Sequence, residues 1–169
     1  MKIFVCAKQV LDPDAVNNYA LAGRLEIGED GKSLTQASIP ELVNAYDEQA
    51  LEVALRMRDK GTDCTIHVVS VGEDRTAILR HAASIGADEI AQILSSHDEP
   101  DGHVTAALLA AHIRAQGGAD LVLCGRQASD DDQGVVPALI AESLEMPLVN
   151  VAKAIEQAGE DLRITRVTP

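Results

Sequence analysis

The sequence predicts an α/β domain with a doubly wound, mostly parallel sheet, helices on both faces and one small β-hairpin. Short unbroken apolar runs, typical of strands buried on both faces, alternate along the chain with stretches of helical periodicity. This alternation indicates parallel βαβ units with right-handed crossovers. The length of 169 residues suits one hydrophobic core, so residues 1–169 are expected to form a single domain.

Four apolar runs are predicted to be the strands of the main sheet, because each is short and ends at a glycine or at polar residues. They cover residues 3–7, 65–71, 89–94 and 121–124. Two later strands are expected at residues 148–155 and 162–167, joined by a turn near Gly159.

Four stretches with apolar residues at helical spacing are predicted to be helices. Residues 44–60 give the clearest pattern, with acidic residues in the first turn and basic residues in the last. Asn44 is the expected N-cap of this helix and Gly61 its stop. The other three cover residues 75–85 with Asp74 as N-cap, residues 103–116, and the stretch from Val135 to the stop at Pro147.

Two polar segments, residues 12–23 and 95–102, contain proline and are predicted to be loops. Between the first of these segments and the first long helix, residues 24–27 and 33–37 flank the dipeptide Asp30-Gly31, which is a hairpin turn signal. We therefore expect a small β-hairpin that stands off the main sheet.

The stretch from 119 to 147 is the candidate binding segment. It passes from a buried strand through Gly125 and a polar loop into a helix that begins at Val135. A helix N-terminus presents free N–H groups and a partial positive charge, which suit a phosphate, and ligands of open parallel sheets lie at the carboxyl ends of the strands. Lys8 and Gln9 follow the first strand at that same edge.

The same residues also fit a solvated turn in which Asp132 caps the helix. The sequence contains neither GxGxxG nor GxxxxGK[ST], so spacing alone leaves both interpretations open. A metal-binding or acid–base function of Asp130 to Asp132 is a further alternative, although a run of carboxylates on a loop is more often exposed charge. No GxSxG elbow is present, and we expect no catalytic residue in this chain.

Composition narrows the class of partner. Aromatic residues make up 2% of the chain and its net charge is −13, so neither base stacking nor a phosphate backbone is favoured and nucleic acid is excluded. The cysteines show no CxxC pair, and Cys6 and Cys124 are interpreted as small hydrophobes in strands. The first apolar run is too short for a signal or membrane segment, which predicts a cytoplasmic protein without membrane contact.

Four segments follow one another in the order seen in one family: KIFVCAKQVLD, VNAYDEQALEVALRMRDKG, HVVSVGEDRTAILRHAASIGADEI and DLVLCGRQASDDDQGVVPALIAESLEMP. With them the chain resembles, over nearly its whole length, the β subunit of electron transfer flavoprotein. The resemblance implies an adenine nucleotide alpha hydrolase-like fold without hydrolysis, paired with an α subunit that carries the redox-active FAD. It also implies a structural AMP on the β subunit, or a second FAD in its place in the electron-bifurcating branch. Flavoprotein dehydrogenases and a quinone-side oxidoreductase are the implied electron partners.

The resemblance also implies which residues bind the nucleotide, and all of them fall at strand ends or helix N-termini. They are Cys6, Asn44, Ala45, Tyr46, Asp47, Val71, Gly125, Arg126, Gln127, Ala128, Asp130, Gly134, Val135 and Val136. Where the AMP-binding pattern has Asn-Gln-Thr-Gly, this chain has Gly134-Val135-Val136-Pro137, which leaves only backbone N–H groups for the phosphate. Tyr46 and Asp47 depart from that pattern too.

Members of the family are expected to continue past residue 169 into a C-terminal arm that embraces the α subunit. Without the α subunit, an exposed docking face predicts self-association of this chain. Two rival classes share the fold: an ATP-binding protein of universal-stress type, and an ATP pyrophosphatase. The first usually has a Gly-x-x-Gly loop and the second a Ser-Gly-Gly motif after the first strand, and the sequence has neither at the required place.

Overall fold

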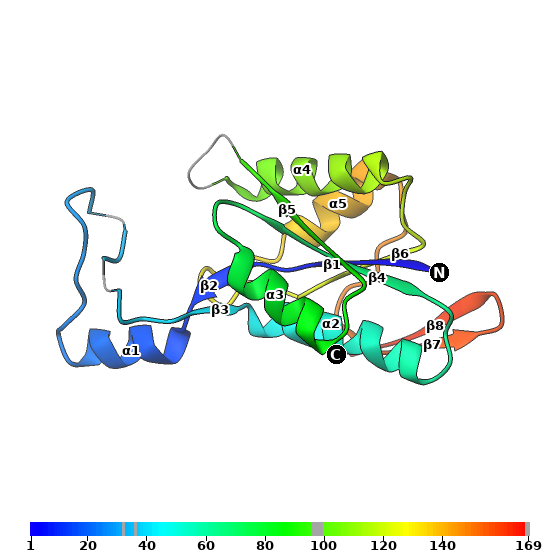
Figure 1. Ribbon diagram of the computed structural model, residues 1–169, viewed down its shortest axis with the longest axis horizontal. Helices are drawn as coiled ribbons and strands as arrows, with labels where there is room; N and C mark the ends of the chain where they lie inside the picture. Colours follow the sequence, from blue (N-terminus) through cyan, green and yellow to red (C-terminus); the bar gives the residue numbers. More distant parts are fainter. Residues whose placement is uncertain (32, 36, 96–99, 168–169) are drawn as a thin grey trace.

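The computed structural model of the chain describes residues 1–31, 33–35, 37–95 and 100–167. Its main sheet has four parallel strands in the order β5-β4-β1-β6 (Figure 1). The strands are β1 (Lys2–Cys6), β4 (Thr65–Val71), β5 (Glu89–Ile93) and β6 (Leu121–Cys124). The predicted α/β fold and the four predicted strands are thereby confirmed.

The chain reverses its direction of travel across the sheet at β1. From β1 it moves outward to β4 and β5, and it then returns to place β6 on the other side of β1. The carboxyl ends of β1 and β6 therefore flank the topological switch point, where open α/β sheets bind their ligands. Cys6 and Cys124 are register partners at these two ends.

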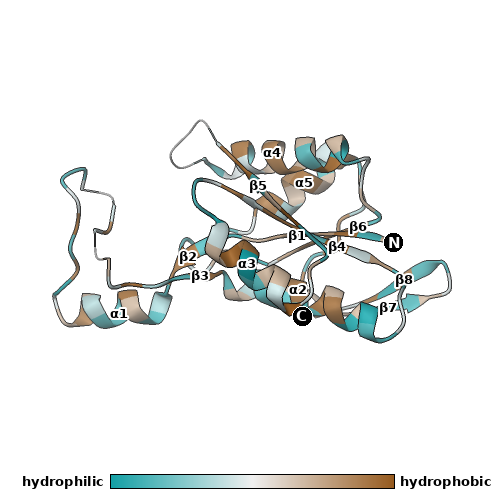
Figure 2. Cartoon of the chain, viewed as in Figure 1, coloured by the Kyte–Doolittle hydropathy of each residue, from teal (hydrophilic) through white to brown (hydrophobic). Residues whose placement is uncertain are grey.

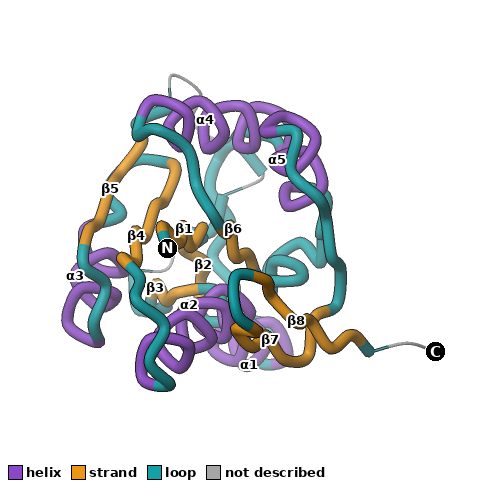
Figure 3. The backbone as a smooth tube through the Cα atoms, turned by 90° about the vertical axis from the view of Figure 1, so that its right-hand side faces the viewer, coloured by secondary structure: helices purple, strands orange, loops and turns teal. Residues whose placement is uncertain are grey.

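Two helices cover each face of the sheet, as Figure 3 shows. Helices α2 (Ala45–Asp59) and α3 (Thr76–Ile85) pack on one face, and α4 (Gly102–Ala115) and α5 (Val136–Leu144) on the other. Because side chains alternate along a strand, Ile3 and Val5 join the first core and Phe4 and Cys6 the second. Apart from Phe4 the buried hydrophobic side chains are mostly aliphatic, and Figure 2 shows the hydrophilic residues gathered at outer turns such as that between β7 and β8.

The segment 12–23, predicted to be a loop, contains helix α1 (Pro13–Leu21), so that prediction was wrong. The carboxylate of Asp12 caps the helix by accepting hydrogen bonds from the N–H groups of Asp14 and Ala15, and Pro13 occupies the first turn, where its missing N–H costs nothing. No residue of α1 is buried. The helix therefore lacks the buried face with which each of the other four helices packs on the sheet.

The predicted hairpin at 24–27 and 33–37 is reduced to one antiparallel bridge between Ile27 and Leu34, and residue 36 lies outside the described residues. Instead, β2 (Gln9–Leu11) and β3 (Glu41–Val43) form a two-stranded antiparallel sheet that the sequence did not predict. We call residues 9–43 the arm. It extends away from the main sheet on this narrow ribbon (Figure 1).

The two late strands are confirmed as an antiparallel pair, with Gly159 in their turn at a φ of 71°. They are β7 (Ala152–Ala158) and β8 (Asp161–Arg166), so the first begins later than residue 148. The pair forms a sheet of its own, and Ile155 and Leu162 pack against the core under α2.

Two predicted helix caps were wrong. Helix α3 has Arg75 in the N-cap position, while Asp74 lies just before it with a φ of 43°. Helix α5 has Val135 in that position, and Asp132 sits in the preceding turn with a φ of 55°. In the predicted loop 95–102, residues 96–99 lie outside the described part of the chain, and Asp101 caps α4 through the N–H of Val104.

Candidate functional site

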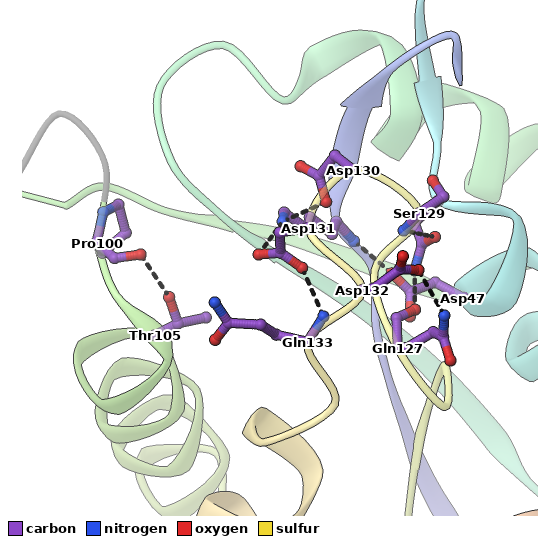
Figure 4. A network of polar contacts seen from close by, with 11 residues as sticks. Asp47, Pro100, Thr105, Gln127, Ser129, Asp130, Asp131, Asp132 and Gln133 are labelled. Carbon is purple, nitrogen blue, oxygen red and sulfur yellow. Dashed lines mark hydrogen bonds and ion pairs between the residues drawn. The ribbon is translucent and has the colours of Figure 1, made fainter. Parts of the chain in front are cut away.

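The candidate site lies at the switch point, where the ends of β1 and β6 meet the first turn of α2. Lys8 follows β1, Gly125 follows β6, and Asn44 precedes α2. Figure 4 shows Asp47 near the loop that carries Gln127, Ser129 and residues 130–133. Of the residues implied by the resemblance, the structure brings Cys6, Asn44, Tyr46, Asp47 and the segment 125–130 together here.

Asp47 joins the two strand ends. One carboxylate oxygen accepts a hydrogen bond from the N–H of Lys8 at 2.8 Å, and the other accepts one from the N–H of Gly125 at 2.8 Å. The residue is only 7% exposed. Its place in the first turn of α2 lets the helix dipole stabilise the charge. Asp47 thus fixes the spacing of β1 and β6 at the edge where a ligand would enter.

Burial raises the pKa of the Asp47 carboxyl above its ordinary value, because a charged group is poorly solvated there. Hydrogen bonds from the Lys8 N–H, the Asn44 side chain and the Gly125 N–H oppose this rise, since they favour the charged form. The charge of Lys8 acts in the same direction. The upward shift shows that desolvation outweighs these contacts.

Asn44 holds the loop that follows β6. Its side-chain amide donates to the carbonyl of Gln127 at 3.0 Å, and its side-chain oxygen accepts from the N–H of Ser129 at 3.2 Å. Its own N–H donates to the carbonyl of Lys8 at 2.8 Å. Asn44 does occupy the N-cap position of α2, but its side chain makes no capping hydrogen bond, so the predicted capping function was wrong.

Gly125 and Gly134 are required by close approach of the backbone. A Cβ on Gly125 would lie 2.4 Å from a carboxylate oxygen of Asp47 and 2.8 Å from Cβ of Tyr46. A Cβ on Gly134 would lie 2.5 Å from the carbonyl oxygen of Arg126. Both glycines therefore let the loop fold tightly against α2 and against itself.

Hydrogen bonds within the loop keep its turn closed. The side-chain amide of Gln127 donates to Asp132 at 2.7 Å, and the N–H of Gln133 donates to Asp131 at 2.9 Å. The N–H groups of Ala128 and Asp132 donate to the carbonyls of Gln133 and Ala128. Most of the carboxylate run is thus occupied in shaping the turn.

Two positively charged side chains, those of Lys8 and Arg126, lie at the edge of the candidate site. The ammonium group of Lys8 contacts Asp130 at 2.7 Å and Asp131 at 3.4 Å, with all three side chains about two-fifths exposed. The guanidinium of Arg126 lies 5.2 Å from the ring centroid of Tyr46. Because exposed ion pairs contribute little to stability, the Lys8 contacts can be exchanged for another anion at small cost.

The N-terminus of α5 borders the same loop. No side chain described in the structure caps it, and Pro137 in its first turn has no N–H to satisfy. Val135 and Val136, named from the resemblance, open this helix. The arrangement leaves backbone donors and a positive dipole end free for an anion.

Cys6 and Val71 mark the ends of β1 and β4 at this edge. A hydrogen bond with Cys124 and burial both raise the pKa of the Cys6 thiol, so the thiol stays neutral. Cys6 is buried in the same core as Phe4, as expected of a small hydrophobe in a strand. The carbonyl of Val71 accepts a hydrogen bond from the Arg75 side chain at 3.1 Å. Sequence reasoning missed Lys8 as a partner of Asp47, although its position directly after a strand end was a usable signal.

Two structural features are absent from the described residues. There, no group of three His, Cys, Asp or Glu side chains is placed to hold a metal ion, and no helix is long and apolar enough to cross a bilayer.

Two hollows lie away from the switch point. One, of about 130 Å³, lies beside Phe4 and His67; the other, of about 510 Å³, lies between the end of α2 and β7.

The chain is similar to proteins of one family. The family described as "electron transfer flavoprotein domain" matches residues 33–169. The electron transfer flavoprotein subunit beta of Syntrophomonas wolfei is 37% identical over 161 residues, which is 94% of this chain and 59% of the relative. The caffeyl-CoA reductase–Etf complex subunit CarD of Acetobacterium woodii is 35% identical, over 92% of this chain and 57% of the relative. The acryloyl-CoA reductase electron transfer subunit gamma of Anaerotignum propionicum is 32% identical, over 99% of this chain and 60% of the relative. The chain thus spans about three-fifths of the length of these relatives.

Replacing Asp47 by Ala is expected to lower the free energy of unfolding by about 2–4 kcal/mol, because the buried N–H of Gly125 and the partly buried N–H of Lys8 lose their acceptor. Urea denaturation followed by circular dichroism measures the change. Asp59→Ala, at the exposed far end of the same helix, is the control and should change stability by less than about 0.5 kcal/mol. Equal effects of the two substitutions would contradict the assigned function of Asp47.

The raised pKa of Asp47 gives a pH dependence of defined sign. A carboxyl whose pKa is higher in the folded state stabilises the fold most below its unfolded pKa, and this contribution is lost as pH rises through the folded pKa. The stability difference between the wild type and Asp47→Asn should therefore shrink from about pH 4 towards pH 7. Urea titrations at several pH values measure it; a difference that grows with pH would overturn the direction of the shift.

Proposed function

The chain belongs to the electron transfer flavoprotein family, and from this premise we propose that it acts as the β subunit of such a flavoprotein. In this proposal it holds an adenine nucleotide, AMP, at the switch point and pairs with an FAD-carrying α subunit. The pair shuttles electrons from flavoprotein dehydrogenases to an acceptor, such as a quinone-side oxidoreductase. The FAD supplies the redox chemistry, and this chain supplies binding and position without bond-making residues of its own.

The observation that carries the nucleotide site is the uncapped N-terminus of α5 beside a loop fixed by Asn44. A phosphate suits such a terminus because the helix dipole and the backbone donors both favour an anion. The departure Gly134-Val135-Val136-Pro137 removes side-chain donors but keeps this backbone arrangement. Gly134 also allows the close approach to the Arg126 carbonyl that folds the loop toward α5.

The residues proposed to hold the nucleotide fall into a polar group suited to the phosphate and an apolar group suited to the base or ribose. The backbone of residues 134–136 and the ammonium group of Lys8 suit the phosphate. The apolar ends of β1 and β4, at Cys6 and Val71, suit a flat base or a ribose edge. Asp130 and Asp131 compete with the phosphate for Lys8, so a ligand with a single phosphate meets less repulsion than a triphosphate.

The names of two relatives support a proposal for the electron partner. The relatives from Acetobacterium woodii and Anaerotignum propionicum are named as parts of caffeyl-CoA and acryloyl-CoA reductase systems. For this chain we therefore propose an acyl-CoA-dependent flavoprotein as the partner of the assembled complex. In a complex of that kind a second FAD in place of AMP is the alternative occupant of the site.

Co-expression with the α subunit encoded by the same organism should give a complex with one copy of each chain and bound FAD. Size-exclusion chromatography with multi-angle light scattering measures the stoichiometry, and the absorption spectrum measures the flavin. ATP bound or turned over by the isolated chain, with no complex formed, would instead favour the universal-stress class.

Asn44→Ala is expected to weaken AMP binding about tenfold, because the loop 127–129 loses both of its side-chain contacts to Asn44. Isothermal titration calorimetry of the complex, after removal of bound nucleotide, measures the dissociation constant. Gln49→Ala, on the exposed side of the same helix, is the matched control and should bind as the wild type does. Unchanged affinity in Asn44→Ala would show that the loop is not part of the nucleotide site.

A further inference from the structure

The described residues of the arm, which spans residues 9–43, form no hydrophobic core cluster of their own. Helix α1 has only nine residues and buries none of them, and β2 pairs with β3 over three residues. Isolated helices and two-stranded ribbons of this size are marginal in water, since packing supplies most of their stability. The segment therefore needs a surface to pack against.

Local polar contacts shape the arm instead. Asp12 caps α1, and the hydroxyl groups of Tyr19 and Ser38 lie 3.0 Å apart between its two limbs. The N–H of Thr35 donates to the carbonyl of Glu26 beside the single bridge, and Asp30 accepts from the N–H of Ser33 in the turn. These contacts preorganise the arm but bury little apolar surface.

Three large apolar side chains on the arm face water. Leu21 is 89% exposed, Ile27 62% and Leu42 44%. Together with the missing core, this exposure marks the arm as one side of a protein–protein interface. Val10 and Ile39, in contrast, are buried where the arm joins the domain, so its base is firmly attached.

The negative charge of the arm indicates which kind of partner surface would bind it. The sequence of the arm contains six carboxylates and two basic residues, and the whole chain carries a net charge of −13. A second copy of this chain would bring like charges together, which disfavours self-association through the arm. A nucleic acid or an anionic membrane is repelled for the same reason. The matching surface is an apolar groove rimmed by Lys and Arg side chains.

We propose that the arm docks into a basic-rimmed apolar groove on a protein partner, and that this partner is the α subunit of the proposed flavoprotein. The inference rests on the proposed function. It also links the interface to the nucleotide site, because the arm begins directly after Lys8 and ends directly before Asn44. The N–H of Asn44 closes the base of the arm by donating to the Lys8 carbonyl at 2.8 Å.

The test is the dissociation constant of the complex between this chain and the purified α subunit, measured by biolayer interferometry. The double variant Leu21→Ser, Ile27→Ser is expected to weaken pairing at least tenfold. Glu26→Lys with Glu29→Lys should weaken it as well, and the loss should diminish as salt screens the charges. Leu94→Ser, which alters an apolar side chain of 71% exposure outside the arm, is the matched control.

The outcomes separate the two proposals. Wild-type pairing that survives both arm variants overturns the docking inference and leaves the proposed function standing. A wild type that does not pair overturns both. Sedimentation of the isolated chain tests whether a second copy of this chain binds the arm. Self-association that disappears in the double variant Leu21→Ser, Ile27→Ser would identify that second copy as the partner of the arm and contradict the assignment to the α subunit. Circular dichroism of each variant checks that the fold is intact.

Discussion

The candidate site depends on one buried carboxylate. Asp47 accepts hydrogen bonds from the first N–H beyond β6 and from the N–H of Lys8 beyond β1, and so sets the spacing of the two strands at the switch point. Gly125 must be glycine because Asp47 and Tyr46 occupy the space of a Cβ. The loop that Asn44 holds, and with it the approach to α5, is placed by this junction. Desolvation of Asp47 is the cost of the arrangement, and it appears as a raised pKa.

Most of the fold could be predicted because burial leaves a pattern in the sequence. Three strands of the main sheet and helices α2 to α5 bury apolar side chains, β5 contributes the partly buried Ala91 and Ile93, and each of these elements was predicted. Helix α1 buries nothing, so only the Asp12-Pro13 start signalled it, and its polar composition indicated a loop. The pairing of β2 with β3 joins segments about thirty residues apart in the sequence, and such short strands carry too little periodicity to detect.

The position of the candidate site could be predicted from the sequence, but the contacts within it could not. The predicted strand ends and helix starts lie at one edge of the sheet, because parallel strands share their carboxyl ends. The contacts that build the site are tertiary: Asn44 meets residues 127 and 129, and Asp47 meets Gly125. Asn44 was assigned as a cap because capping and long-range bonding favour the same residue type at the same position. The arm leaves and rejoins the domain at this same place, between Lys8 and Asn44, whose backbones are joined by a hydrogen bond of 2.8 Å.

The central claim is that the edge organised by Asp47 and Asn44 binds an adenine nucleotide. The most direct measurement is to purify the complex of this chain with its α subunit, denature it, and quantify the released nucleotides by mass spectrometry. We expect one AMP in addition to one FAD for each pair of chains, and two FAD without AMP would place the complex in the electron-bifurcating branch. One FAD with no second nucleotide would contradict the claim.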